Sequence, residues 1–100
     1  MSHKIQTLSG YMHEYQKSVL QPEEFWSRIA ESFHWKKPWS KTLDWNFEGP
    51  DVKWFLDGKL NITENILDRH LFTKGDDPAI IWEPNEPNEE HKIISYRELY

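Results

Sequence analysis

The 100-residue chain has no cysteine, only four glycines and no long hydrophobic run. Without cysteine there can be no disulfide framework, no thiolate nucleophile and no cysteine-ligated metal. Gly10, Gly49, Gly58 and Gly75 are isolated from one another, so no glycine-rich loop is present to bind phosphate. No apolar run approaches the roughly 18 residues of a membrane-spanning helix. The N-terminal residues also lack the apolar core of a signal peptide. We therefore expect a cytoplasmic protein.

The charge balance excludes further classes of partner. Acidic residues outnumber basic ones by 17 to 12, which gives a net charge of -5. Such a surface disfavours nucleic acid and anionic membranes as partners. The five histidines are scattered without a ligand spacing such as HExxH, so we expect no metal site. Lys36 and Lys37, between Trp35 and Trp39, are compatible with phosphate or base binding, although a solvated rim is the simpler interpretation.

Aromatic residues are abundant although the hydrophobic fraction is only 37%. The chain contains six Trp, five Phe and four Tyr, which argues for a packed rather than a disordered protein. Each buried Trp contributes about 4–6 kcal/mol through the 150–250 Å² that it removes from water. Ordering the backbone costs ~1–2 kcal/mol per residue. Six Trp cannot offset that cost alone, so we expect many of these rings to pack against protein outside the given sequence.

The first sixty residues predict helices followed by short strands. A helical stripe is formed by Ile5, Leu8, Met12, Tyr15 and Val19. A second helix begins at Pro22 and is expected to end near Phe33 or His34, ahead of Pro38. Alternation of apolar and polar residues over 43–47 predicts a strand, Gly49-Pro50 ends it, and 52–55 form a second extended piece.

The remaining forty residues predict a helix, a hairpin and the start of another helix. Asn61 is an N-cap for a helix from Ile62, with Glu64 at a capping-box position, and Gly75 can end that helix in a left-handed conformation. Residues 79–82 and 92–94 read as the two strands of a hairpin. Ser95 to Glu98 form a second capping box. The helix it opens is too short to be stable alone, so we expect a truncated chain.

The Asp68-Arg69-His70 sequence invites comparison with a catalytic dyad. Two helical residues that are two positions apart point in different directions, which disfavours an Asp68–His70 pair. The structural interpretation places Arg69 against backbone carbonyls or acids of a larger domain and His70 in packing. The catalytic alternative remains open.

The order and spacing of several segments resemble the N-terminal region of AMP-forming acetyl-CoA synthetases, in the acyl-adenylate-forming superfamily. The most recognisable block contains Trp54, Phe55, Gly58 and Leu60-Asn61, followed by Asn65 and Leu67-Asp68-Arg69-His70-Leu71. Pro22-Glu23, Phe25-Trp26 and Trp35-Lys-Lys-Pro38 resemble the family's opening helices and their exit. Residues 79–83 and 94–99 resemble its first hairpin and the helix that follows. Two positions depart from the pattern: Gln21 stands where an acidic or amide cap often precedes the proline, and Asp57 stands where Gly can occur.

The resemblance implies an α+β fragment of a larger α/β adenylating domain. Residues 1–72 would form the N-terminal extension and 73–100 the truncated beginning of the AMP-binding domain. The full-length enzyme would use Mg-ATP and coenzyme A, converting acetate to acetyl-adenylate and then to acetyl-CoA. The family's phosphate loop, adenylate motif, acyl pocket and mobile lysine all lie beyond the sequence given. We therefore expect an inactive fragment without catalytic, cofactor or metal residues.

The resemblance gives seven residues a structural role: Trp54, Phe55, Gly58, Asn61, Asp68, Arg69 and His70. The expected partner is the remainder of the same chain, with self-association of the isolated fragment as a further expectation. Two alternatives stay open. One is a stand-alone aromatic interaction module, and the other is the same segment of a propionyl- or acetoacetyl-CoA synthetase.

Overall fold

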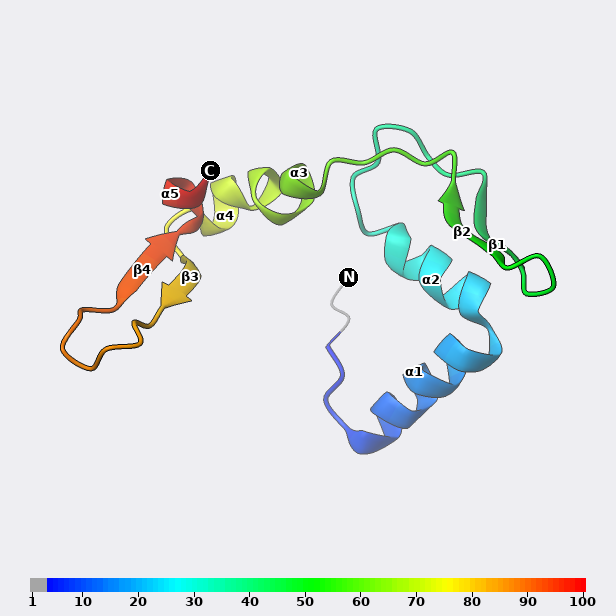
Figure 1. The fold of residues 1–100 in the computed structure, drawn as a ribbon, viewed down its shortest axis with the longest axis horizontal. Coiled ribbons are helices and arrows are strands. Elements are labelled where there is room, and N and C mark those ends of the chain that lie inside the picture. Colours follow the sequence, from blue (N-terminus) through cyan, green and yellow to red (C-terminus); the bar gives the residue numbers. More distant parts are fainter. Residues whose placement is uncertain (1–3) are drawn as a thin grey trace. The chain divides into compact units, whose positions relative to one another are not determined.

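The computed structural model describes residues 4–100, which form two compact units that divide after Leu60 (Figure 1). The first unit contains α1 (Leu8–Leu20), α2 (Pro22–Ala30), β1 (Lys41–Asn46) and β2 (Asp51–Leu56). The second contains α3 (Ile62–Ile66), the 3-10 helix η1 (Asp68–His70), α4 (Leu71–Lys74), β3 (Pro78–Trp82), β4 (Lys92–Ser95) and α5 (Tyr96–Leu99). Each unit combines helices with a two-stranded antiparallel sheet, which confirms the α+β class.

The two N-terminal helices form as their local sequences predict, with different ends. Thr7 caps α1 by accepting a hydrogen bond from the Gly10 amide at 3.0 Å, so Ile5 lies outside the helix. The expected end of α2 near Phe33 or His34 is wrong, because the helix ends at Ala30. The Ala30 carbonyl instead accepts hydrogen bonds from the Phe33 amide and from the Trp35 indole. These two hydrogen bonds turn the chain out of the helix ahead of Pro38.

A single charged contact joins α1 to α2 among the ion pairs of the described residues. The Arg28 Nη2 atom lies 2.5 Å from the Glu14 Oε2 atom. The hydrogen bond from Arg28 holds the pKa of the Glu14 carboxyl below its ordinary value. Both side chains are partly exposed, so the contact orients the helices more than it stabilises them.

The predicted strands of the first unit pair with each other as β1 and β2. Leu43 lies opposite Trp54, and Trp45 lies opposite Val52. The chain then returns to the segment before β1, where Lys37 and Lys59 form an isolated antiparallel bridge. This bridge holds the turn after β2 against the segment that follows α2.

The helix predicted from Ile62 to Leu71 is not continuous. The Asn61 side chain caps it as expected, although it accepts from the Thr63 amide at 3.0 Å rather than from that of Glu64. α3 ends before Leu67, which has φ -119° and ψ -70°, and the chain continues as η1 and α4. Asp68 and His70 therefore lie on a short 3-10 turn.

The expected left-handed conformation of Gly75 is also wrong. Gly75 is right-handed, with φ -53° and ψ -37°, and it is buried. A Cβ atom there would lie 2.5 Å from the Leu71 carbonyl oxygen and would overlap the Arg97 guanidinium. Close approach, rather than backbone conformation, is thus the reason for glycine at this position.

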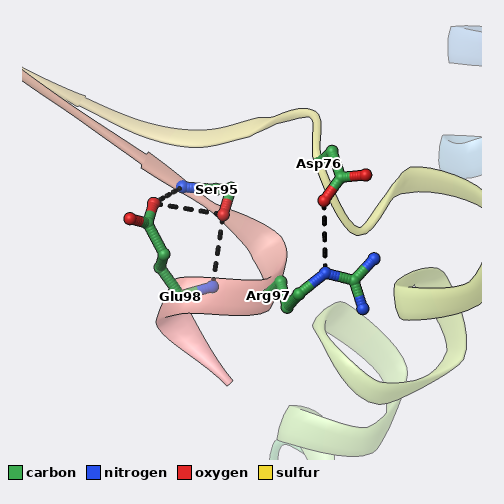
Figure 2. A network of polar contacts seen from close by, with 4 residues as sticks. All are labelled: Asp76, Ser95, Arg97 and Glu98. Atoms are coloured by element: carbon green, nitrogen blue, oxygen red, sulfur yellow. Dashed lines mark hydrogen bonds and ion pairs between the residues drawn. The ribbon is translucent and has the colours of Figure 1, made fainter.

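The C-terminal hairpin and helix match the prediction. Ile81 lies opposite Ile93 in the β3–β4 pair. Ser95 and Glu98 form both halves of the capping box, with the Glu98 amide donating to the Ser95 hydroxyl at 3.2 Å (Figure 2). Arg97 reaches back to Asp76, with 3.2 Å between Nε and Oδ1 (Figure 2). This contact and the Arg97 amide bond to the Gly75 carbonyl connect α5 to the end of α4.

The capping box predicts a local response to acid. The Ser95 amide donates to the Glu98 carboxylate at 2.9 Å, and this bond lowers the pKa of Glu98. A carboxyl whose folded pKa is depressed stabilises the fold above its unfolded pKa, and that contribution is lost as the pH falls through the folded pKa. We expect the Ser95 amide resonance to titrate with this lowered pKa by NMR. Glu98→Gln keeps an acceptor and should remove the titration; a Ser95 shift independent of pH in the unsubstituted protein would contradict the expectation.

Candidate functional site: an apolar groove in the first unit

Three aromatic rings gather where the chain leaves α2 and where β2 ends. The Trp35 ring centre lies 4.9 Å from that of Trp39 and 5.5 Å from that of Phe55, and Trp39 and Phe55 are 5.6 Å apart. Each indole also makes a hydrogen bond, Trp35 to the Ala30 carbonyl at 2.8 Å and Trp39 to the buried Thr42 hydroxyl at 2.9 Å. The rings are therefore held in place at their polar ends as well as by packing.

The turn after β2 has an unusual backbone that brings this cluster together. Phe55 and Asp57 have positive φ angles of 50° and 63°, a conformation that costs a non-glycine residue roughly 1–2 kcal/mol. The packing of the Phe55 ring offsets that cost. A Cβ atom on Gly58 would lie 2.7 Å from Trp35 Cζ3, so glycine lets the indole lie directly on the turn. The positive φ of Asp57 also explains why glycine can occur at this position of the family pattern.

An apolar groove of about 260 Å³ lies beside the cluster. Its lining consists of Trp26, Ile29, Ala30, Phe33, Trp35, Phe55 and Leu60. Ala30 is buried, while Trp26 and Leu60 keep 40% and 38% of their surface exposed, so the groove is open to solvent. Because every lining side chain is hydrophobic, the groove suits an apolar occupant and offers no polar side-chain atoms to a phosphate or a carboxylate.

Other apolar surface extends beyond the groove. On α1 the predicted stripe is exposed, with Leu8, Met12, Tyr15 and Val19 each retaining between 47% and 78% of their surface. Trp54, next to Phe55 and 6.4 Å from Trp26 between ring centres, is 44% exposed. Within residues 4–100 the one fully buried hydrophobic side chain is Ala30. This surface agrees with the expectation that the rings pack against further protein.

The second unit holds the other half of the predicted motif around a buried amide. Asn65 is 2% exposed and donates to the Asn61 carbonyl at 2.9 Å. Arg69 donates to the Asn65 amide oxygen at 3.5 Å and to His70 Nε2 at 3.4 Å. The His70 ring centre lies 6.0 Å from that of Tyr96. Arg69 and His70 thus contact neighbouring side chains within their own unit.

The structure assigns the seven motif residues to two separate groups. Trp54, Phe55 and Gly58 belong to the first unit, whereas Asn61, Asp68, Arg69 and His70 belong to the second. Asp68 is exposed, and within the described residues no hydrogen bond or ion pair joins it to His70, so the two do not form a dyad. Sequence reasoning missed the burial of Asn65, although its spacing of four from Asn61 and from Arg69 is a detectable helical signal.

The structure also describes the residues considered for base binding, metal binding and membrane insertion. Trp35 and Trp39, which flank Lys36 and Lys37, are half-buried and pack on each other and on Phe55. Among residues 4–100, no three His, Asp or Glu side chains come together in a way that could hold a metal ion. In the same range, no helix has the length and apolar character needed to cross a membrane.

Comparison with known proteins connects this architecture to a family. The family model described as the acetyl-coenzyme A synthetase N-terminus matches residues 11–66, which include most of α1, all of α2, both strands of the first unit and α3. The acetyl-coenzyme A synthetase of Desulfatibacillum aliphaticivorans is 53% identical over 91 residues, covering 90% of this chain and 14% of its own. That of Stutzerimonas stutzeri is 45% identical over 100 residues, covering 98% of this chain and 15% of its own.

A third relative gives the same relation, since the acetyl-coenzyme A synthetase of Rhizobium rhizogenes is 43% identical over 99% of this chain and 15% of its own. The chain therefore spans about one seventh of the length of the curated relatives it matches. The matched residues contain the aromatic cluster, the whole groove lining and the Asn61 cap. The chain belongs to the family of acetyl-coenzyme A synthetase N-terminal regions.

Proposed function

We propose that this chain is the N-terminal structural segment of an acetate–CoA ligase. The observation that carries the proposal is the identity of 53% to an acetyl-coenzyme A synthetase over nine tenths of this chain. The full-length enzyme would join acetate to the α-phosphate of Mg-ATP, releasing pyrophosphate, and would then transfer the acetyl group to the coenzyme A thiol, releasing AMP. Its expected location is the cytoplasm.

The proposed contribution of this segment is packing rather than chemistry. Its exposed aromatic and aliphatic side chains provide a surface for the larger adenylating body, and its charges lie mostly in solvent-exposed loops and helix ends. Burying apolar surface stabilises association by about 25 cal/mol per Å². We propose residues 1–72 as the extension that packs on that body and 73–100 as the first part of the AMP-binding domain. In this scheme Arg69 and His70 are packing residues.

The experiment that tests the proposal compares the full-length chain with the 100-residue segment. We expect the full-length protein to form AMP and acetyl-CoA when acetate, Mg-ATP and coenzyme A are supplied. The segment alone should show no saturable ATP or coenzyme A binding by calorimetry. Propionate and acetoacetate in place of acetate test the alternative substrates. A full-length protein inactive with all three acids would overturn the proposal, and micromolar ATP binding by the segment would contradict its structural role.

A further inference from the structure

We propose that the Asp57-Gly58 bond, in the turn after β2, is a site of covalent modification at which the aspartate converts to a β-linked isoaspartate. The chain contains no other Asp-Gly pair and no Asn-Gly pair. Glycine favours the conversion because it places no side chain beside the backbone nitrogen that must attack. Asp57 is exposed, so the water that completes the reaction reaches it. The turn therefore holds the chemical groups that the conversion needs.

The conversion has two steps and needs no reagent other than water. The Gly58 backbone nitrogen attacks the Cγ atom of the protonated Asp57 carboxyl, a C–N bond forms, and the carboxyl hydroxyl leaves with the amide proton as water. The product is a five-membered succinimide. Water then adds to one of its two carbonyls. Cleavage at the former side-chain carbonyl restores aspartate, whereas cleavage at the main-chain carbonyl leaves the backbone running through Cβ and Cγ. No atom is oxidised or reduced.

The fold restrains both reacting groups. The Ser40 hydroxyl donates to Asp57 Oδ2 at 2.9 Å, and the Gly58 amide donates to the Phe55 carbonyl at 3.0 Å. The Trp35 indole lies on Gly58, where an added Cβ atom would be only 2.7 Å from Cζ3. Both hydrogen bonds must break before the nitrogen can reach the carboxyl carbon. The reaction therefore starts from a locally opened turn, and Ser40 and Trp35 control how often the turn opens.

The backbone of the turn makes such opening easier than in an ordinary loop. Asp57 has a φ of 63°, and Phe55 a φ of 50°, both in the region that is costly for residues other than glycine. The strain is relieved when the turn opens, so the restraint depends on the contacts of Ser40 and Trp35 rather than on the backbone itself.

The product would disrupt the first unit. A β-linkage lengthens the main chain by one atom between Asp57 and Gly58, which displaces Gly58 from the Phe55 carbonyl. The next residue, Lys59, bonds to Lys37 in both directions at 2.9 and 3.1 Å, and this bridge needs an exact register. Isoaspartate at position 57 is therefore expected to open the bridge, and the Lys37 and Lys59 amides should exchange faster in the converted protein.

Peptide mapping of the full-length protein after prolonged incubation at neutral pH tests the proposal. Isoaspartate has the mass of aspartate, so chromatographic retention and electron-transfer fragmentation distinguish the two. We expect isoaspartate at position 57, forming about fivefold faster in Ser40→Ala because one hydrogen bond is lost. Ser40→Thr keeps the hydroxyl and should match the unsubstituted protein. Asp51 is the internal control, since it is exposed but precedes the β-branched Val52, and it should not convert.

The unfolded chain in urea gives the rate of the unrestrained bond, which should exceed that of every folded protein. Absence of isoaspartate from position 57 in folded protein, while the unfolded chain converts, would overturn the proposal. Conversion as fast in the folded protein as in urea would show that the turn restrains nothing. If Ser40→Ala does not fold, Trp35→Phe replaces it, with the same fivefold rise expected from loss of the indole hydrogen bond. A rate unchanged by the variant that folds would contradict the control by these side chains.

Discussion

Replacing Trp35 with alanine is expected to open the first unit around the turn that follows β2. The substitution removes ring contacts with Trp39 and Phe55, the hydrogen bond to Ala30 and the atoms that lie on Gly58. Trp-to-Ala changes in cores cost about 3–5 kcal/mol, and the partial exposure of Trp35 places the expected cost at the lower end, about 3 kcal/mol.

Hydrogen exchange in the full-length protein measures this effect locally. The Lys36, Lys37 and Lys59 amides bond across the bridge at 2.7–3.1 Å and report on its opening. A loss of about 3 kcal/mol corresponds to exchange roughly 100-fold faster. Trp35→Phe keeps a ring but loses the indole hydrogen bond, which is expected to cost about 1 kcal/mol of local stability. Exchange at the same amides should then rise only about fivefold.

Trp45→Ala is the matched control for that experiment. Trp45 is 53% exposed, and its ring centre lies 4.6 Å from that of Phe47, outside the cluster around Trp35. Surface substitutions change stability by about 0.5 kcal/mol or less, so the bridge amides should be nearly unaffected. If Trp35→Ala and Trp45→Ala accelerate exchange equally, the aromatic cluster does not hold the turn.

Replacing Asn65 with alanine is expected to destabilise the second unit by about 2 kcal/mol. The buried side chain donates to the Asn61 carbonyl and accepts from Arg69, so its loss leaves both groups with one partner fewer and creates a cavity. Desolvated polar groups are costly to leave without a partner.

The amides of Leu67 and His70, which bond to the Thr63 and Leu67 carbonyls at 2.8 and 2.9 Å, should then exchange about 30-fold faster. Asn88→Ala in the exposed loop between β3 and β4 is the control, with no expected change at these amides. Unchanged protection in Asn65→Ala would show that the amide does not organise the Asp68-Arg69-His70 segment.

The proposed function treats the exposed apolar side chains of this segment as surface that a larger protein body covers. The described residues contain one fully buried hydrophobic side chain, so a conventional core is nearly absent from residues 4–100.

Local sequence signals determined the elements of this protein. Caps and turn residues act over a few positions, which is why Asn61, Ser95 with Glu98 and the Gly49-Pro50 break predict their elements correctly. Hydrophobic alternation located the first strand, because one face of a strand repeats every second residue, and apolar runs between turn residues located the C-terminal hairpin. The resemblance carried by Trp54, Phe55 and the Asp68-Arg69-His70 block identified the family correctly.

Tertiary contacts decided what those local signals could not. The end of α2 depends on the Trp35 indole reaching Ala30, and glycine at position 75 depends on Arg97 and Leu71. The buried Asn65 is held by hydrogen bonds with Asn61 and Arg69. Periodicity records which side of an element is apolar, whereas the ends, close approaches and buried polar groups are set by the side chains that arrive from elsewhere in the chain.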